Sequence, residues 1–212
     1  MSLILPKRRL LFLHIPKCAG QSVQKAFGVV HHHQHHKLND FPEDWQDYFR
    51  FTFVRHPVHR FFSACNYNLR VALKTQQQLQ HVPIEQLSAT KRYRLYLAEE
   101  RPSLAAIAGD LHRNRLRKLI TFKRQARWLR RGEPQFIGRV ERFDQDFSLL
   151  MRLIAPGRQL RRTQAPHINR SASTLRLDDL STRELGWIVD YYAKDFAMTG
   201  YSEAFQELEE LH

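Results

Sequence analysis

The segment that decides the fold is LLFLHIPKCAGQS, residues 10–22. Its mainly apolar first half, Leu10 to Ile15, predicts a short buried strand, and the stretch from Pro16 to Gly20 interrupts that strand. The residues from Ser22 to Phe27 then predict a first helical turn. A strand, a tight loop and a helix in this order form the repeating unit of parallel α/β sheets.

A second segment, FTFVRHPVHRFFS at residues 51–63, repeats the same order. Aromatic and β-branched residues from Phe51 to Val54 predict a strand, His56 and Pro57 turn the chain, and a helix is expected over Val58 to Tyr67. Two such units predict a sheet with parallel strands.

The rest of the chain continues this alternation of helices and strands. The further expected elements are helices over Ile84 to Leu97 and Ser103 to Ile120, a strand over Phe136 to Val140, a helix from Asp144 to Ile154, and a helix from Leu185 to Phe196 after a Ser181/Glu184 capping box. We therefore expect a doubly wound α/β fold with a P-loop-like central parallel sheet flanked by helices. A length of 212 residues with 42% hydrophobic residues suits one domain over residues 1–212.

The charge balance points to anionic ligands. The chain has 34 basic and 21 acidic residues and a formal charge of +13, which favours a nucleotide, a polyanionic substrate, nucleic acid or a membrane surface without choosing among them. Residues 112–131 contain nine lysines and arginines and no acid. This basic stretch indicates either an anionic acceptor or a solvated helical face.

The apolar runs near the N-terminus, Leu3 to Leu5 and Leu10 to Leu13, are far too short for a membrane span or a signal peptide. We therefore expect a soluble, cytoplasmic protein without a transmembrane segment. In that compartment Cys18 and Cys65 are expected as reduced thiols.

The loop after the first strand has the residue types of an anion-binding turn. Gly20 lets the backbone approach an oxyanion, Lys17 adds a positive charge, and Ser22 supplies a hydroxyl donor or a helix cap. The loop is not a Walker A motif, because the lysine precedes the glycine. A cysteine phosphatase would place arginine where Gln24 stands. An ordinary strand-to-helix turn with a surface lysine is the remaining alternative.

The second segment places Arg55 at the carboxyl end of its strand and Ser63 two turns into the helix. Ligands of open α/β sheets bind at that edge. Arg55 can make a bidentate contact with a phosphate, and Ser63 can add a hydroxyl. Arg60 either assists them or lies with its aliphatic stem over the core.

Together the two segments resemble the carbohydrate-type sulfotransferases, a superfamily that is also described as sulfotransferase family 2-like. These enzymes use 3′-phosphoadenosine-5′-phosphosulfate (PAPS) as donor. The shared patterns are HIPK-small-Gly and FVR-x-P-x-x-R-x-x-S. The resemblance implies that the first loop holds the 5′-phosphosulfate, through Pro16, Lys17, Cys18, Ala19, Gly20, Gln21 and Ser22. It also implies that Lys17 is catalytic and that Arg55 and Ser63 bind the 3′-phosphate.

Weaker similarities and some departures accompany these patterns. The former include residues 125–129, 136–147, 166–171 and 195–201, so the resemblance extends over nearly the whole chain. There are three departures from the family pattern. Cys18 stands where Thr is common, Gln21 where the family usually has Thr or Ser, and His56 where Asp or Asn is common.

A sulfuryl transfer also needs a general base for the acceptor hydroxyl, and histidine has the unperturbed pKa nearest neutrality. Residues 31–36 read HHHQHH and lie between the two phosphate loops, where related sulfotransferases often place their base. We rank His36 and His35 ahead of His33. A metal site from histidines four residues apart and an exposed polar loop are the alternatives for this run; the reaction itself requires no metal.

The leading hypothesis is therefore transfer of a sulfuryl group from PAPS to a hydroxyl acceptor, with a carbohydrate as the acceptor class that the resemblance implies. A P-loop-like small-molecule kinase would need ATP and magnesium, and the sequence offers no convincing metal-binding carboxylate. A basic nucleic-acid-binding protein would explain the charge but not the paired loops, and no helix-turn-helix, zinc-finger or stacking signature is visible. Nucleic acid is therefore not the expected partner.

Overall fold

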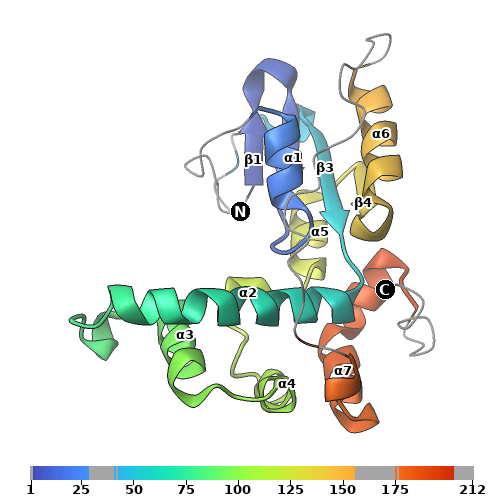
Figure 1. Cartoon of the computed structure of the whole chain (residues 1–212). Coiled ribbons are helices and arrows are strands. Elements are labelled where there is room, and N and C mark those ends of the chain that lie inside the picture. Colours follow the sequence, from blue (N-terminus) through green and yellow to red (C-terminus); the bar gives the residue numbers. More distant parts are fainter. Residues whose placement is uncertain (1, 29–40, 42, 156–174, 176, 203–212) are drawn as a thin grey trace. The chain divides into compact units, whose positions relative to one another are not determined.

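The computed structural model describes residues 2–28, 41, 43–155, 175 and 177–202 (Figure 1). The chain divides into two compact units. The first unit comprises residues 1–56, 125–171 and 204–212, and the second comprises residues 57–124 and 172–203. The single domain expected over residues 1–212 stays a prediction, since two compact units can belong to one domain.

The first unit is built on a four-stranded sheet in the order β1-β2-β3-β4. The strands are β1 (Ser2–Leu5), β2 (Leu10–Leu13), β3 (Phe49–Val54) and β4 (Phe136–Arg139). Strands β2, β3 and β4 are parallel, and β1 pairs with β2 antiparallel. The predicted α/β fold with a central sheet flanked by helices is confirmed, and the sheet is mostly rather than wholly parallel because of β1.

Strand β1 was not expected from the sequence. It returns into β2 through η1 (Pro6–Arg8), a single 3₁₀ turn, and Arg9 with a φ of 49°. A residue with left-handed backbone lets a chain reverse within few residues. The antiparallel edge therefore arises from a tight local turn rather than from a helical crossover.

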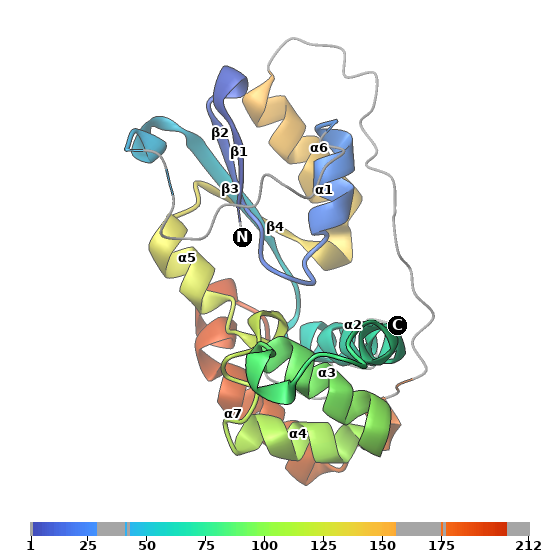
Figure 2. The same cartoon turned by 90° about the vertical axis from the view of Figure 1, so that its left-hand side faces the viewer.

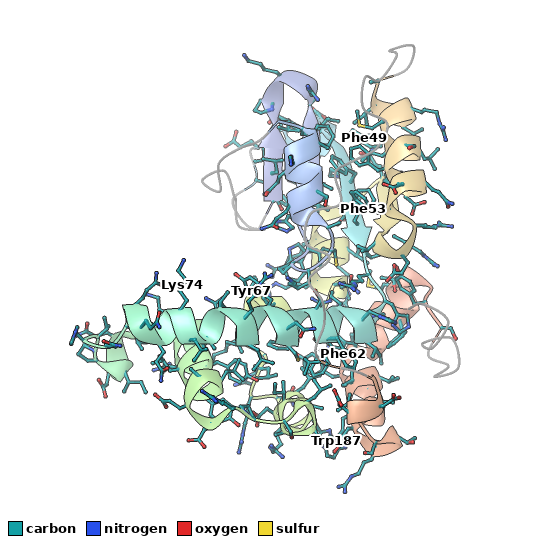
Figure 3. The ribbon with its side chains drawn as sticks, in the orientation of Figure 1. Phe49, Phe53, Phe62, Tyr67, Lys74 and Trp187 are labelled. Carbon is teal, nitrogen blue, oxygen red and sulfur yellow. The ribbon has the colours of Figure 1, made fainter. Side chains whose placement is uncertain are left out.

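Helices cover both faces of the sheet (Figure 2). On one face lie α1 (Gly20–Ala26) and α6 (Phe143–Ile154), and on the other lies α5 (Ala126–Gly132). Phe53, labelled in Figure 3, projects toward α6, where its ring centroid is 4.8 Å from that of Phe143. A Cβ on Gly132 would lie 2.3 Å from the Leu13 side chain, so only glycine lets α5 pack this closely on the other face. Burial on both faces explains why β2 is a continuous apolar run.

The second unit consists of helices. They are α2 (Pro57–Gln78), α3 (Ala89–Glu100), α4 (Leu104–His112) and α7 (Thr182–Thr199). Helix α2 packs against α3 and α7, and α4 packs against α7 (Figure 1). The capping box at Ser181 and Glu184 and the N-cap at Ser103 are both present, as predicted.

Helix α2 continues to Gln78 although it was expected to end at Tyr67, and two more of the expected helices have clearly different bounds. The helix expected over Ile84 to Leu97 is a 3₁₀ turn followed by α3, because Ser88 caps a new helix by accepting from the Lys91 N–H. The helix expected over Ser103 to Ile120 ends at His112, after which Asn114 has a φ of 58°. The 3₁₀ turn before α3 is η4 (Ile84–Gln86). Apart from η1 and η4, the 3₁₀ turns within the described residues are η3 (Trp45–Asp47), η5 (Ile120–Phe122), η6 (Val140–Arg142) and η7 (Leu177–Asp179).

Among the helices of the described residues, none is long and apolar enough to cross a membrane.

Candidate functional site

The candidate site lies in the first unit, at the carboxyl ends of the three parallel strands. The register pairs Phe12 with Phe51 and Phe53 with Gly138, so the chain leaves β2, β3 and β4 at the same edge of the sheet. The buried Thr52 hydroxyl donates to the Leu13 carbonyl at 2.6 Å, which fixes the end of β2 against β3. The two loops predicted to bind phosphate therefore begin side by side, at the edge where α/β proteins bind ligands.

The first loop has an unusual backbone. Lys17 has a φ of 72° and Ala19 a φ of 54°, whereas Cys18 between them is not in the positive-φ region. This alternation turns successive N–H groups toward one side, and such a concave backbone is a known anion-binding arrangement. The loop is closed by the Cys18 N–H, which donates to the Ile15 carbonyl at 3.2 Å. An ordinary strand-to-helix turn does not require two non-glycine residues at positive φ.

Gly20 is required by the close approach of the His14 ring. A Cβ at position 20 would lie 1.9 Å from His14 Nε2. The His14 ring in turn stacks on Phe12, with ring centroids 5.6 Å apart. The sequence explained this glycine by the approach of a ligand to the backbone, and the structure adds the packing of His14 as a second reason.

The other predicted residues of the first loop differ in exposure. Pro16, Cys18, Gly20 and Ser22 are buried, Lys17 and Ala19 are half-buried, and Gln21 is exposed. Ala19 is the N-cap of α1 and no side chain caps this helix. The suggestion that Ser22 caps the helix is therefore wrong, because Ser22 lies within the first turn. Its role as a hydroxyl donor stays a prediction.

Arg55 has an anchored backbone and a guanidinium that is available for a ligand. Its N–H donates to Gln125 Oε1 at 3.0 Å, and its carbonyl accepts from Gln125 Nε2 at 2.8 Å. The next peptide is held as well, because the His56 N–H donates to Glu141 Oε1 at 2.8 Å. The half-buried guanidinium makes no hydrogen bond or ion pair with any described residue of its own unit. An anchored arginine whose guanidinium has no partner among the described residues of its unit suits an anion ligand.

Gln125 was missed as a site residue. It is fully buried, and besides its two bonds to Arg55 its Oε1 accepts from the Cys18 thiol at 3.3 Å. One carboxamide thus contacts both predicted phosphate loops. The only sequence signal was its place in the segment at residues 125–129, which contributed to the resemblance but carried no role. Glu141 was also missed, because its segment at residues 136–147 likewise contributed to the resemblance without carrying a role.

Four predicted site residues remain: Ser63, His33, His35 and His36. Ser63 is half-buried on α2, in the second unit. The three histidines proposed as general base, His33, His35 and His36, fall outside the described residues, as does the alternative metal site in that run. Among the described residues there is no group of three or more His, Cys, Asp or Glu that could hold a metal ion.

Arg60 belongs to the second unit and is fully buried. Its guanidinium donates to the Thr121 carbonyl at 3.1 Å and to the Lys123 carbonyl at 2.7 Å, and it lies 3.9 Å from the Asp195 carboxylate. The same group lies over the ring of Tyr192, 5.1 Å from its centroid. Of the two roles considered for Arg60, the structure thus supports a structural one.

Tyr192 completes this cluster. Burial raises the pKa of its phenol, which keeps the group protonated. The phenol donates to the Phe122 carbonyl at 3.0 Å. Arg60 and Tyr192 therefore hold successive carbonyls of the segment that leads to Gln125 in the chain.

The basic stretch at residues 112–131 is not one helical face. Arg113 and Arg115 each lie 3.1 Å from the carboxylate of Asp110, two residues before the stretch. Arg124 donates to the Tyr191 carbonyl at 2.6 Å and stacks over the Tyr191 ring. Part of the stretch thus has partners within the second unit, and its acid-free sequence alone does not demand an external anion.

Comparison with known protein families matches residues 1–202 to the family described as "Sulfotransferase family". This match covers the loop at Lys17, the end of β3 at Arg55 and the contact residue Gln125. No curated protein and no solved structure matches the chain.

Proposed function

The chain belongs to the sulfotransferase family, whose members transfer sulfuryl groups, and from this premise we propose that its donor is PAPS and its acceptor a carbohydrate hydroxyl. The observation that carries the proposal is the contact of one buried carboxamide, that of Gln125, with both Cys18 and Arg55. It joins a loop of anion-binding backbone to an arginine whose charge is not used within its unit. PAPS has two phosphate groups, one for each segment.

The division of labour follows from the two segments. The loop from Pro16 to Ser22 binds the 5′-phosphosulfate, and Arg55 reads the 3′-phosphate that distinguishes PAPS from ATP. Ser63 is proposed as a second ligand of the 3′-phosphate. This proposal rests on the sequence pattern alone, because Ser63 belongs to the second unit and Arg55 to the first. A planar guanidinium suits this task, since it can bind a phosphate through two parallel hydrogen bonds.

The proposed chemistry is an in-line transfer. The acceptor oxygen forms a bond to sulfur while the bond between sulfur and the bridging oxygen of the 5′-phosphate breaks, and adenosine 3′,5′-bisphosphate leaves. Lys17 stabilises the negative charge that develops on the bridging oxygen, which is the kind of electrostatic contribution that dominates such transfers. The acceptor proton passes to a general base, for which His36, His35 and His33 remain the candidates.

An anionic acceptor is the narrower part of the proposal. Arg127 and Arg130 are exposed on α5, three residues apart, and neither makes a hydrogen bond or ion pair with a described residue of the first unit. Side chains three residues apart on a helix lie on the same side. These two arginines therefore suit an acidic glycan better than the paired arginines near Asp110.

The test is transfer of labelled sulfate from PAPS to a panel of acidic and neutral glycans. We expect label in acidic glycans, loss of transfer in Lys17→Ala, and transfer that weakens with added salt. Arg127→Glu and Arg130→Glu should raise the KM for the acceptor and leave that for the donor unchanged. Phosphate transfer from ATP without sulfate transfer would contradict the donor, and salt-independent turnover of neutral glycans would contradict the anionic acceptor.

A further inference from the structure

We propose that Gln125 is a positioning residue that couples the loop at Lys17 to Arg55, so that the two phosphates of one donor are bound together. This inference rests on the proposed function, because it concerns how the proposed donor site is assembled. It goes beyond that proposal by making the 3′-phosphate preference of Arg55 depend on a second residue, Gln125, which acts through the Arg55 backbone.

The carboxamide of Gln125 uses both of its ends at this point. Oε1 accepts from the Arg55 N–H at 3.0 Å and from the Cys18 thiol at 3.3 Å, while Nε2 donates to the Arg55 carbonyl at 2.8 Å. A carboxamide carries an acceptor oxygen and a donor nitrogen side by side, so it can bind the N–H and the carbonyl of the same residue. A carboxylate would place a second acceptor against the Arg55 carbonyl, and an apolar side chain would leave three polar groups without this partner.

Gln125 is itself held in place. It is fully buried, and its carbonyl accepts from the N–H groups of Trp128 at 2.8 Å and Leu129 at 3.2 Å, at the start of α5. Trp128 is fully buried and Gly132 at the end of the same helix packs on Leu13. The carboxamide therefore projects from a rigid element, as precise positioning of a site requires.

The consequence for the site concerns two short backbone segments. Cys18 lies between Lys17 and Ala19, the two residues at positive φ, so its contact with Gln125 supports the loop conformation. Both backbone groups of Arg55 are fixed, so its side chain starts from a defined Cα position. Without Gln125, each segment could still bind a phosphate, but the spacing between the two would be less well defined.

The chain offers a matched control at the opposite end of β3. Gln135 Oε1 accepts from the Arg50 N–H at 2.9 Å, and the Gln135 N–H donates to the Arg50 carbonyl at 2.7 Å. Gln135 thus also bonds the backbone of an arginine on this strand, away from the candidate site. Loss of the Gln125 side chain removes the bonds to Arg55, directly after β3, and loss of the Gln135 side chain removes a bond to Arg50 within β3. Only the first should affect nucleotide selectivity.

The experiment measures the Kd of adenosine 3′,5′-bisphosphate and of adenosine 5′-monophosphate by calorimetry on the full chain. The readout is the ratio of the two constants, which reports the preference for the 3′-phosphate. We expect Gln125→Met and Gln125→Glu to reduce this ratio by roughly tenfold, the effect of one well-placed hydrogen bond to a charged group. Gln135→Met should leave the ratio as in the wild type.

A second pair of variants tests the coupling through the thiol. Cys18→Ser keeps a donor for Gln125 Oε1 and should retain more of the preference than Cys18→Ala. In the Gln125→Met background the two Cys18 variants should bind alike, because the partner of the hydroxyl is gone. Such non-additivity is the signature of a direct interaction.

The outcomes separate the inference from the proposed function. A wild-type protein that binds both nucleotides equally refutes the proposed donor and the inference with it. A wild-type protein that prefers the bisphosphate, with an unchanged ratio in folded Gln125→Met or an equal loss in Gln135→Met, refutes only the inference. If Gln125→Met does not fold, the Cys18 pair decides, and equal ratios for Cys18→Ser and Cys18→Ala overturn the coupling.

Discussion

Arg60 should contribute to stability and not to ligand binding, although it lies only five residues from Arg55. Arg60→Met removes the two charged donors that bind the carbonyls of Thr121 and Lys123. It also leaves the fully buried Asp195 carboxylate without the cation 3.9 Å away. The methionine retains most of the aliphatic volume, so the loss of stability measures the contribution of the guanidinium.

The size of the loss follows from these contacts. A hydrogen bond from a charged donor contributes about 1.5–3 kcal/mol, and removing one partner of a buried ion pair costs about 3–5 kcal/mol. The two figures describe overlapping effects of one group, so we expect a decrease of about 3–5 kcal/mol in the free energy of unfolding.

Urea unfolding measures this decrease as a lower midpoint with an unchanged slope. The matched control is Arg113→Met, in the same unit, because the Arg113 side chain is 51% exposed and Arg115 would still pair with Asp110. It should change the stability by less than about 0.5 kcal/mol. An Arg60→Met protein within about 1 kcal/mol of the wild type that has lost nucleotide binding would refute the reasoning and make Arg60 a ligand residue.

Three further predictions concern the loop, the chemistry and helix α7. Gly20→Ala should lower both the melting temperature and the affinity for adenosine 3′,5′-bisphosphate, because its Cβ would meet His14; adding His14→Ala should restore part of both, and no recovery would count against the contact. Lys17→Ala should lower kcat more than it weakens donor binding, since its charge acts on the transition state; a change confined to KM would argue for binding alone. Ser181→Ala should cost about 1 kcal/mol in thermal unfolding through loss of the N-cap of α7. Hydrogen bonds first from the Ser181 side chain and then from its backbone lower the pKa of Glu184. The stability that the Glu184 carboxylate contributes should therefore be complete above the ordinary glutamate pKa and be lost as the pH falls through the lowered pKa. A Glu184→Gln variant whose stability keeps this acid dependence would contradict its assignment to Glu184.

The sequence was sufficient where the signal is local. Strand β2 is a continuous apolar run because both of its faces are buried, and β3 has the aromatic and β-branched residues that favour a strand. Pro57, Ser103 and the Ser181/Glu184 pair mark the starts of helices by their own side chains. The two loops that follow the strands could be predicted to share an edge, because parallel strands end at the same side of a sheet.

The rest depends on contacts between distant residues. Gln125 is 107 residues from Cys18 and 70 from Arg55, so no periodicity or local motif predicts their contact. Arg60 and Arg55 are both arginines five residues apart, but Arg60 is fully buried and Arg55 is half-buried. A single sequence does not reveal this difference in burial. The helix expected to reach Ile120 ends at His112. Leu116 and Leu119, which follow it, are buried although they are not in a helix. Their spacing therefore imitated the apolar face of a longer helix.

The most direct test of the central claim is a calorimetric titration of the wild-type protein with adenosine 3′,5′-bisphosphate and with ADP. Both nucleotides have two phosphates, and only the first has one at the 3′ position that Arg55 is proposed to read. We predict binding of the bisphosphate that is at least roughly tenfold tighter, and loss of this difference in Arg55→Met, as expected for one bidentate charged contact. Equal binding of the two nucleotides, or tighter binding of ADP, would contradict PAPS as the donor.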